Sequence, residues 1–175
     1  MIFSPVQIGK LKISNRIVVA PMCQYSAVDG VMTDWHTQHL MQLGYSGAGL
    51  VMVEATAVER IGRITHHCVG IYNDFCERSI KKTLELAKSV SQKKIAFGIQ
   101  LAHAGRKAST QRPWEGRKSL TKEEDPWITM GPSSFAFDEG WHIPQFMEDK
   151  DLESIKNKFV EASMRAIKIG FDLIE

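Results

Sequence analysis

The sequence contains few cysteines, no block of like charge and no long apolar run, and each absence argues against a class of protein. There are three cysteines, Cys23, Cys68 and Cys76, an odd number without CxxC spacing, and this favours reduced thiols in a cytosolic protein. The formal net charge is +2 with both signs well mixed, so neither nucleic acid nor an anionic membrane is indicated as a partner. No apolar stretch approaches the length of a membrane span.

The first residues also lack the features of a signal peptide. Residues 1–7 have no basic start and no apolar central region, so we expect no secretion signal and a cytoplasmic location. The chain has 175 residues, of which 43% are hydrophobic and 24% are charged. These are the values of one ordinary globular domain with a hydrophobic core.

Strand and helix patterns alternate along the chain. After a small hairpin over residues 5–13, the sequence predicts strands at Ile17–Ala20, Leu50–Glu54, Ile95–Leu101 and Phe171–Glu175. Helices are predicted from about Asp34 to Gly44, from Asp74 along an apolar face to Val90, and along a stripe from Leu152 to Ile169 that ends at Gly170. Apolar strands separated by amphipathic helices predict a parallel sheet covered by helices. Four such units would form half of an eight-stranded α/β barrel or a small open sheet.

A long irregular segment, at about residues 102–148, follows the third predicted strand. Three of the four tryptophans lie in it, together with most of the prolines. Loops of this length are usually functional or disordered, and the aromatic content argues against disorder. We therefore expect this segment to fold over the carboxyl ends of the strands as a lid.

The best candidate for chemistry follows the first predicted strand. Pro21 cannot donate to a sheet, so the strand should end there, and Cys23 and Tyr25 come directly afterwards. In an extended segment, side chains two residues apart lie on the same side of the backbone. Reactive side chains at the carboxyl end of a buried strand lie where α/β folds place their active sites.

Four segments together carry a resemblance to a known family. Residues 15–26 read NRIVVAPMCQYS, residues 53–58 VEATAV, residues 62–65 GRIT and residues 100–107 QLAHAGRK. In this order they resemble the old yellow enzyme family of flavin-dependent ene-reductases. Cys23, Tyr25 and the RPWEG of residues 112–116 are similar to its xenobiotic-reductase branch. Members are (β/α)8 TIM barrels of about twice this length, so the chain resembles the N-terminal half of one.

The resemblance implies a cofactor, a reaction and roles for particular residues. FMN would be reduced by NAD(P)H and would pass hydride to an activated alkene, a small molecule with an electron-poor C=C bond. By this likeness Ala20, Pro21, Met22 and Cys23 would lie along the flavin ring, and Ala55 would pack against it. Gln100 would hydrogen-bond the pyrimidine edge. Cys23 would tune the redox potential, and Tyr25 would bind the activating group of the substrate. A homo-oligomer is also expected.

The resemblance further implies that several functional residues of the family lie beyond Glu175. These are the substrate-anchoring histidine pair, the proton-donating tyrosine, a flavin-binding arginine and the phosphate site. On this expectation residues 1–175 are catalytically incomplete and require the remainder of the barrel. The alternatives left open are a truncated or scaffold half-barrel that pairs with another chain, and a barrel enzyme without flavin.

Other candidate residues have weaker signals. His36 and His39 lie at i, i+3 on a predicted helix, but no third metal ligand is near them in the sequence, so no metal site is predicted. His103, together with Arg106 and Lys107, would either approach the substrate or the flavin, or form structural ion pairs.

Overall fold

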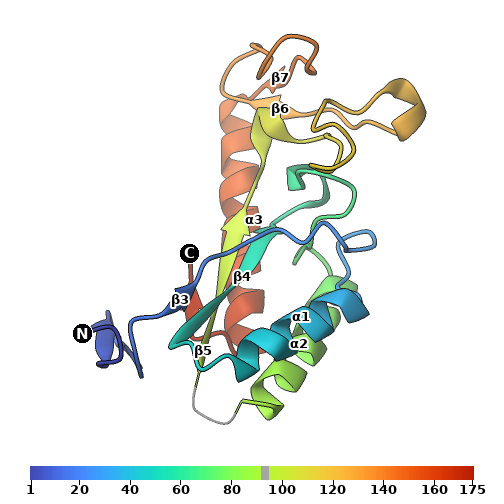
Figure 1. Cartoon of the computed structure of the whole chain (residues 1–175). Coiled ribbons are helices and arrows are strands. Elements are labelled where there is room, and N and C mark those ends of the chain that lie inside the picture. The colour runs from blue at the N-terminus through green and yellow to red at the C-terminus, as the bar shows by residue number, and fades with distance from the viewer. Residues whose placement is uncertain (92–94) are drawn as a thin grey trace.

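The computed structural model describes residues 1–91 and 95–175, and its centre is a parallel sheet. The strand order is β3-β4-β5-β8. The strands are β3 (Val18–Val19), β4 (Leu50–Ala57), β5 (Ala96–Ala102) and β8 (Leu173–Ile174). Because every pair in this sheet is parallel, the carboxyl ends of the strands meet at one edge (Figure 1). The predicted succession of parallel strands is confirmed.

The pairing of β4 with β5 contains an irregularity near its carboxyl end. Val53 pairs with Ile99, whereas Thr56 pairs with Leu101, so Glu54 and Ala55 together lie opposite Gln100. The strand continues to Ala57, beyond the predicted end at Glu54, because Ala57 pairs with Ala102 and also forms a bridge with Gly70. This tertiary pairing is not visible in the local sequence. A bulge of this kind redirects side chains and is common beside active sites.

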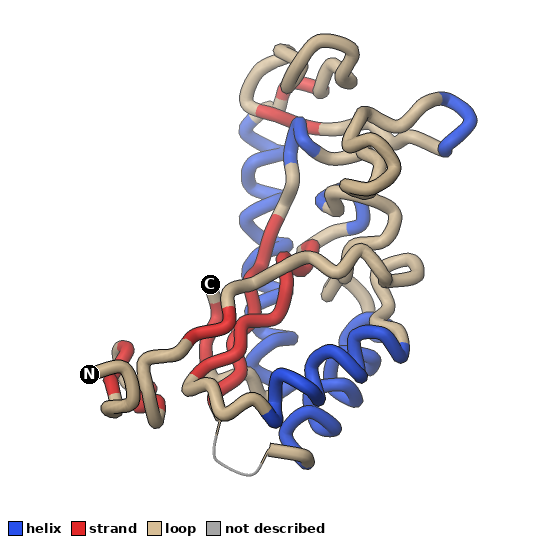
Figure 2. The backbone as a smooth tube through the Cα atoms, in the orientation of Figure 1, coloured by secondary structure: helices blue, strands red, loops and turns tan. Residues whose placement is uncertain are grey.

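Three helices cover one face of the sheet (Figures 1 and 2). They are α1 (Asp34–Tyr45), α2 (Asp74–Ser89) and α3 (Asp149–Ile169). The side chain of Asn73 caps α2 by accepting from the backbone N–H of Cys76 at 2.9 Å. Gly170 ends α3 with φ of +96°, a conformation that glycine adopts without steric cost. All three predicted helices are therefore confirmed, with small differences at their ends.

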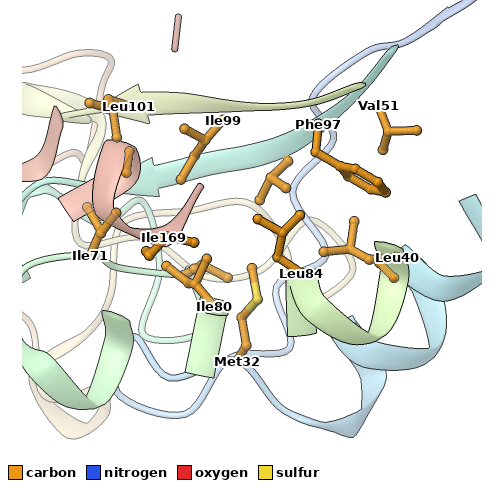
Figure 3. Packing of buried hydrophobic residues seen from close by; sticks show 14 of the residues in the cluster. Met32, Leu40, Val51, Ile71, Ile80, Leu84, Phe97, Ile99, Leu101 and Ile169 are labelled. Atoms are coloured by element: carbon orange, nitrogen blue, oxygen red, sulfur yellow. The ribbon is translucent and has the colours of Figure 1, made fainter. Parts of the chain in front are cut away.

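Apolar side chains fill the space between the sheet and the helices. Phe97 and Ile99 of β5 point toward Leu84 and Ile80 of α2, and Ile169 of α3 joins the same cluster (Figure 3). Phe97 and Ile99 are fully buried. Burying side chains of this size stabilises the fold by about 1.5–3 kcal/mol each. This core fixes the sheet on which the candidate site is built.

The opposite face of the sheet is packed by a hairpin near the amino ends of the strands. Leu50, Met52 and Ala96 pack there against Ile13, which belongs to the hairpin of β1 (Val6–Ile8) and β2 (Leu11–Ile13). This hairpin was predicted from the sequence and is confirmed. Toward the carboxyl ends, the same face carries the more accessible residues described below.

Apolar side chains are exposed at the margins of the fold. β3 and β8 are the two edge strands of the described sheet, and Val160, Met164 and Ile167 of α3 are all more than half exposed. The apolar stripe of α3 is not buried at its beginning, because Leu152 is 50% exposed. That first part of α3 extends beyond the sheet, as Figure 1 shows. None of the helices in the described residues is long and apolar enough to span a membrane.

The long segment after β5 lies beyond the carboxyl end of the sheet (Figure 1). It contains two 3-10 turns, η2 (Gly105–Lys107) and η3 (Lys122–Glu124), and the paired strands β6 (Met130–Gly131) and β7 (Gln145–Phe146). Trp127 attaches it to the loop after β4, because its indole N–H donates to the carbonyl of Ile61 at 2.9 Å. Arg63, 2% exposed, lies over the Trp127 ring at 5.6 Å.

Candidate functional site

Accessible residues are rare in the two central strands, and they lie together. Ala55 is the one residue of β4 that is not buried. In β5 the corresponding residues are Gln100 and Ala102. Alternation along β5 places Gln100 and Ala102 on the face of Ala96, away from the helices. Two small side chains and one amide are therefore the accessible groups of two otherwise buried strands.

The turn that carries Cys23 and Tyr25 crosses this region at the end of β3. The strand ends at Val19, before Pro21, as predicted. The backbone N–H of Gln24 donates to Oε2 of Glu54 at 3.0 Å, which ties the turn to the bulge of β4. The expectation of a fully extended segment is wrong, because Tyr25 has φ of +50°. Such a left-handed non-glycine residue persists where its surroundings hold it, and here the neighbouring Gln24 is bonded to β4.

Cys23 is a protonated thiol in this environment. Burial raises its pKa to about 12, and the neighbouring Cys68 and Glu54 act in the same direction. Hydrogen bonding by the backbone of Ala55 and by Tyr25 acts in the opposite direction. Cys23, Tyr25 and Ala55 are therefore neighbours, as the predicted site requires. At neutral pH the thiol is a weak donor and a poor nucleophile.

Tyr25 contacts the long segment. Its ring meets the ring of Trp114 edge to face, with centroids 5.9 Å apart and planes at 79°. The guanidinium of Arg112 lies 5.4 Å from the Trp114 ring and pairs with Glu115. Burial raises the pKa of Tyr25 to about 12, while Arg117 opposes this rise. The phenol is therefore protonated at neutral pH and can donate a hydrogen bond.

The other predicted site residues lie around this centre. Ala20 and Met22 are exposed and Pro21 is half-buried; Met22 is 53% exposed. Ala20 and Met22 line a small cavity together with Glu54 of β4. Gln100 lies opposite the bulge, and its amide N–H donates to the Glu175 carboxylate at 2.9 Å.

Several residues of this region were missed from the sequence. Ala102 shares the accessible face of Gln100, and simple alternation along the strand would have indicated it. Glu54 is an acid at the end of an apolar run, a signal that favours a special role. His36 was considered only as a weak metal ligand and Trp114 only as part of the RPWEG resemblance. Their contacts with Glu54, at 3.4 Å, and with Tyr25 are tertiary, and no local signal predicts them.

The weaker candidates His103, Arg106 and Lys107 have partners of their own. Nε2 of His103 lies 2.9 Å from Oε1 of Glu59, and Nδ1 accepts the backbone N–H of Gly105 at 3.1 Å, so its described contacts are structural. Arg106 and Lys107 lie over the ring of Phe137. Among the described residues, no group of three histidine, cysteine or acidic side chains has the arrangement of a metal site.

Comparisons with known proteins place this geometry in context. The model of the NADH:flavin oxidoreductase / NADH oxidase family matches residues 1–175. An NADH:flavin oxidoreductase of Gibberella zeae is 44% identical over 99% of this chain and 42% of its own length. An NADPH dehydrogenase of Geobacillus thermodenitrificans is 37% identical over the whole chain and 47% of its own length. The chain thus spans about half the length of the curated relatives it matches.

Solved structures agree on the fold. An Old Yellow Enzyme from Pichia sp. superimposes with a TM-score of 0.81 and 24% identity, over 99% of this chain and 44% of the other. Morphinone reductase gives a TM-score of 0.79 and 23% identity, over 99% and 46%. These neighbours are TIM barrels, so the described sheet and helices correspond to part of such a barrel. From its sequence and its fold, the chain belongs to the NADH:flavin oxidoreductase / NADH oxidase family.

Proposed function

We propose that this chain supplies one part of the FMN site of an NAD(P)H-dependent oxidoreductase that reduces activated C=C bonds. Ala20, Pro21, Met22 and Cys23 would lie along one edge of the flavin ring, with Ala55 beneath it. Gln100 would hydrogen-bond the polar edge of the ring. FMN, when bound, supplies hydride chemistry that amino-acid side chains lack. The long segment at 102–148 would act as the lid of this site.

The observation that carries the proposal is the accessible surface in the central strands. Ala55 and Ala102 are small, and a flat aromatic cofactor can approach their backbones closely. Gln100 lies between them on the sheet and offers both a donor and an acceptor. This combination of an apolar wall with one fixed amide fits the ring of a flavin. The family match and the flavin-related names of the relatives support the same cofactor.

The chemistry of Cys23 and Tyr25 suits two different tasks. A neutral, half-buried thiol beside the flavin would influence its redox potential without attacking the substrate. A protonated phenol 5.9 Å from Trp114, centroid to centroid, would donate a hydrogen bond to the carbonyl or nitro oxygen of an activated alkene. That bond withdraws electron density from the C=C bond and thereby favours hydride addition.

Replacement of Gln100 tests the cofactor site. In Gln100→Ala the flavin edge loses its partner, and we expect FMN binding to weaken by about 1–3 kcal/mol. Gln111→Ala is the matched control, because the Gln111 amide also donates to a glutamate, Oε1 of Glu124, at 2.9 Å but in the long segment. Equal FMN dissociation constants for wild type and Gln100→Ala, by fluorescence titration, would remove Gln100 from the site.

Replacement of Tyr25 tests the reaction. Tyr25→Phe removes only the hydroxyl, so we expect slow reoxidation of the reduced protein by cyclohexenone and nearly unchanged reduction by NAD(P)H. Rapid-mixing kinetics separates the two half-reactions. A variant impaired only in its reduction by the nicotinamide would show that Tyr25 does not bind the alkene.

A second candidate function is a half-barrel scaffold that pairs with a complementary chain. It is favoured by the exposed apolar residues Val160, Met164 and Ile167 on α3 and by β3 and β8, the edge strands of the described sheet. Absorbance of the purified protein discriminates between the candidates, because a scaffold without a flavin site is colourless.

A further inference from the structure

A buried acid and a buried histidine meet directly beneath the Cys23–Tyr25 turn. Glu54 of β4 is 5% exposed and His36 of α1 is 1% exposed. Oε1 of Glu54 lies 3.4 Å from Nε2 of His36. The two atoms do not form a hydrogen bond, and Nε2 has no hydrogen-bond partner among the described residues. A buried pair that carries no hydrogen bond between its members is costly to maintain, so a role in the fold alone explains it poorly.

The protonation of His36 follows from its other ring nitrogen. The backbone N–H of Thr33 donates to Nδ1 at 3.0 Å. A backbone amide can only donate, so Nδ1 carries a lone pair, and the single proton of the ring is on Nε2. In this arrangement Nε2 approaches Oε1 without a hydrogen bond, and Oε2 is the oxygen of Glu54 that is engaged, by Gln24.

The second oxygen of Glu54 holds the reactive turn. Oε2 accepts the backbone N–H of Gln24 at 3.0 Å. The Gln24 side chain is fixed as well: its amide N–H donates to the carbonyl of Met22 at 2.8 Å, and its oxygen accepts from the indole of Trp35 at 3.1 Å. Gln24 lies between Cys23 and Tyr25, so Glu54 fixes the segment that orients both side chains.

The charged and titratable groups near Cys23 come from several elements. Tyr25 lies on the same turn, Glu54 on β4 and Cys68 in the loop after β4, and each of them acts on the thiol. From the other packed elements, His36 and His39 of α1 face Glu54, and Arg117 of the long segment faces Tyr25. Glu54 is the one carboxylate among these groups, and it is the group whose charge can be removed with little change of shape.

We propose that Glu54 is a positioning residue of the site: its carboxylate holds the backbone of Gln24 in place, and its negative charge disfavours a thiolate at Cys23. The link to catalysis rests on the proposed function, in which Cys23 lies beside the flavin. The effect on the thiol does not rest on it, because the groups concerned are all in this chain. A buried negative charge here would also lower the reduction potential of a flavin bound beside it.

The experiment measures the alkylation rate of Cys23 by iodoacetamide against pH in the full encoded protein, with peptide mass spectrometry to assign the modified cysteine. In Glu54→Gln the charge is lost and the shape is kept. We expect the pH midpoint of alkylation to fall and the rate at mildly alkaline pH to rise roughly threefold or more. The matched control is Glu59→Gln, which changes the acid of a second acid–histidine pair. In this control the pH dependence of Cys23 alkylation should not change.

A conservative variant keeps the test decisive if Glu54→Gln does not fold. Glu54→Asp retains the carboxylate, but the shorter side chain no longer reaches the backbone N–H of Gln24. FMN should therefore bind more weakly, whereas the pH midpoint of Cys23 alkylation should stay near that of wild type. A wild-type profile in Glu54→Gln, or wild-type FMN affinity in Glu54→Asp, would overturn the proposal. A wild-type protein without flavin would instead refute the proposed function and leave the thiol result intact.

Discussion

Arg60 and Arg63 bind the same acid, Asp29, but one arginine is exposed and the other is buried. Their contributions to stability should therefore differ. Both guanidinium groups reach Oδ1 of Asp29, at 3.0 Å for Arg60 and 3.2 Å for Arg63. The side chain of Arg60 is 63% exposed, whereas that of Arg63 is 2% exposed. Arg63 also donates to the carbonyls of Arg60 and His66, at 2.9 and 3.3 Å, and lies over Trp127.

Replacement of each arginine by methionine should have very different effects. Arg63→Met keeps the bulk but leaves two partly buried carbonyls without their donor and removes the support of Trp127. We expect a loss of about 3–5 kcal/mol, as for breaking other buried charged networks. Arg60→Met should cost about 1 kcal/mol or less, because exposed ion pairs contribute little.

Urea unfolding of both variants is the assay, with the free energy compared at constant m-value. Limited proteolysis of the 102–148 segment is a second readout, because Trp127 anchors that segment above Arg63. Similar losses in the two variants, or a loss below 1 kcal/mol for Arg63→Met, would refute the reasoning that burial decides the contribution of these contacts.

Three further predictions concern the site and the margins of the fold. Cys23→Ala should retain FMN and shift its reduction potential, and an unchanged potential would contradict the tuning role of the thiol. The pKa values of Cys23 and Cys76 are raised from 9.0 to about 12 and about 11. Their contribution to stability is therefore present below pH 9 and is lost as pH rises from 9 toward 12. Thermal unfolding should show this decrease, and it should be smaller in Cys23→Ala. Residues 1–175 expressed alone should self-associate, because β3 and β8 have open edges; a compact monomer with a cooperative melt, by size exclusion and near-UV circular dichroism, would contradict this.

The order and type of the central strands and of the three helices could be predicted because each has a local cause, whereas β6 and β7 in the long segment were not predicted. The apolar run at Leu50, the periodic face from Ile80 to Ala87 and the glycine at 170 are all visible in the sequence. The end of β4 could not be predicted, because it depends on pairing with Gly70 and Ala102. The exposure of Leu152 was not predictable either, since periodicity identifies an apolar face but not what covers it.

The candidate site also has residues that could be predicted from the sequence and contacts that could not. Cys23, Tyr25, Ala55 and Gln100 were predicted through a family resemblance, and the fold brings the first three together, with Gln100 opposite the bulge. The contact of Trp114 with Tyr25 joins distant segments, and the pairing of His36 with Glu54 joins a helix to a strand. Such contacts depend on the relative placement of whole elements, which local sequence patterns do not specify.

The most direct test of the account is the flavin content of the full encoded protein, in wild type and in Ala55→Leu. The chromophore is measured by absorbance and is identified by mass after release by heat. We expect the wild type to carry the bands of oxidised flavin and to release FMN. Ala55→Leu should lose them, because its larger side chain occupies the accessible position of β4. A colourless wild type, or an Ala55→Leu variant with full FMN content, would contradict the proposed site.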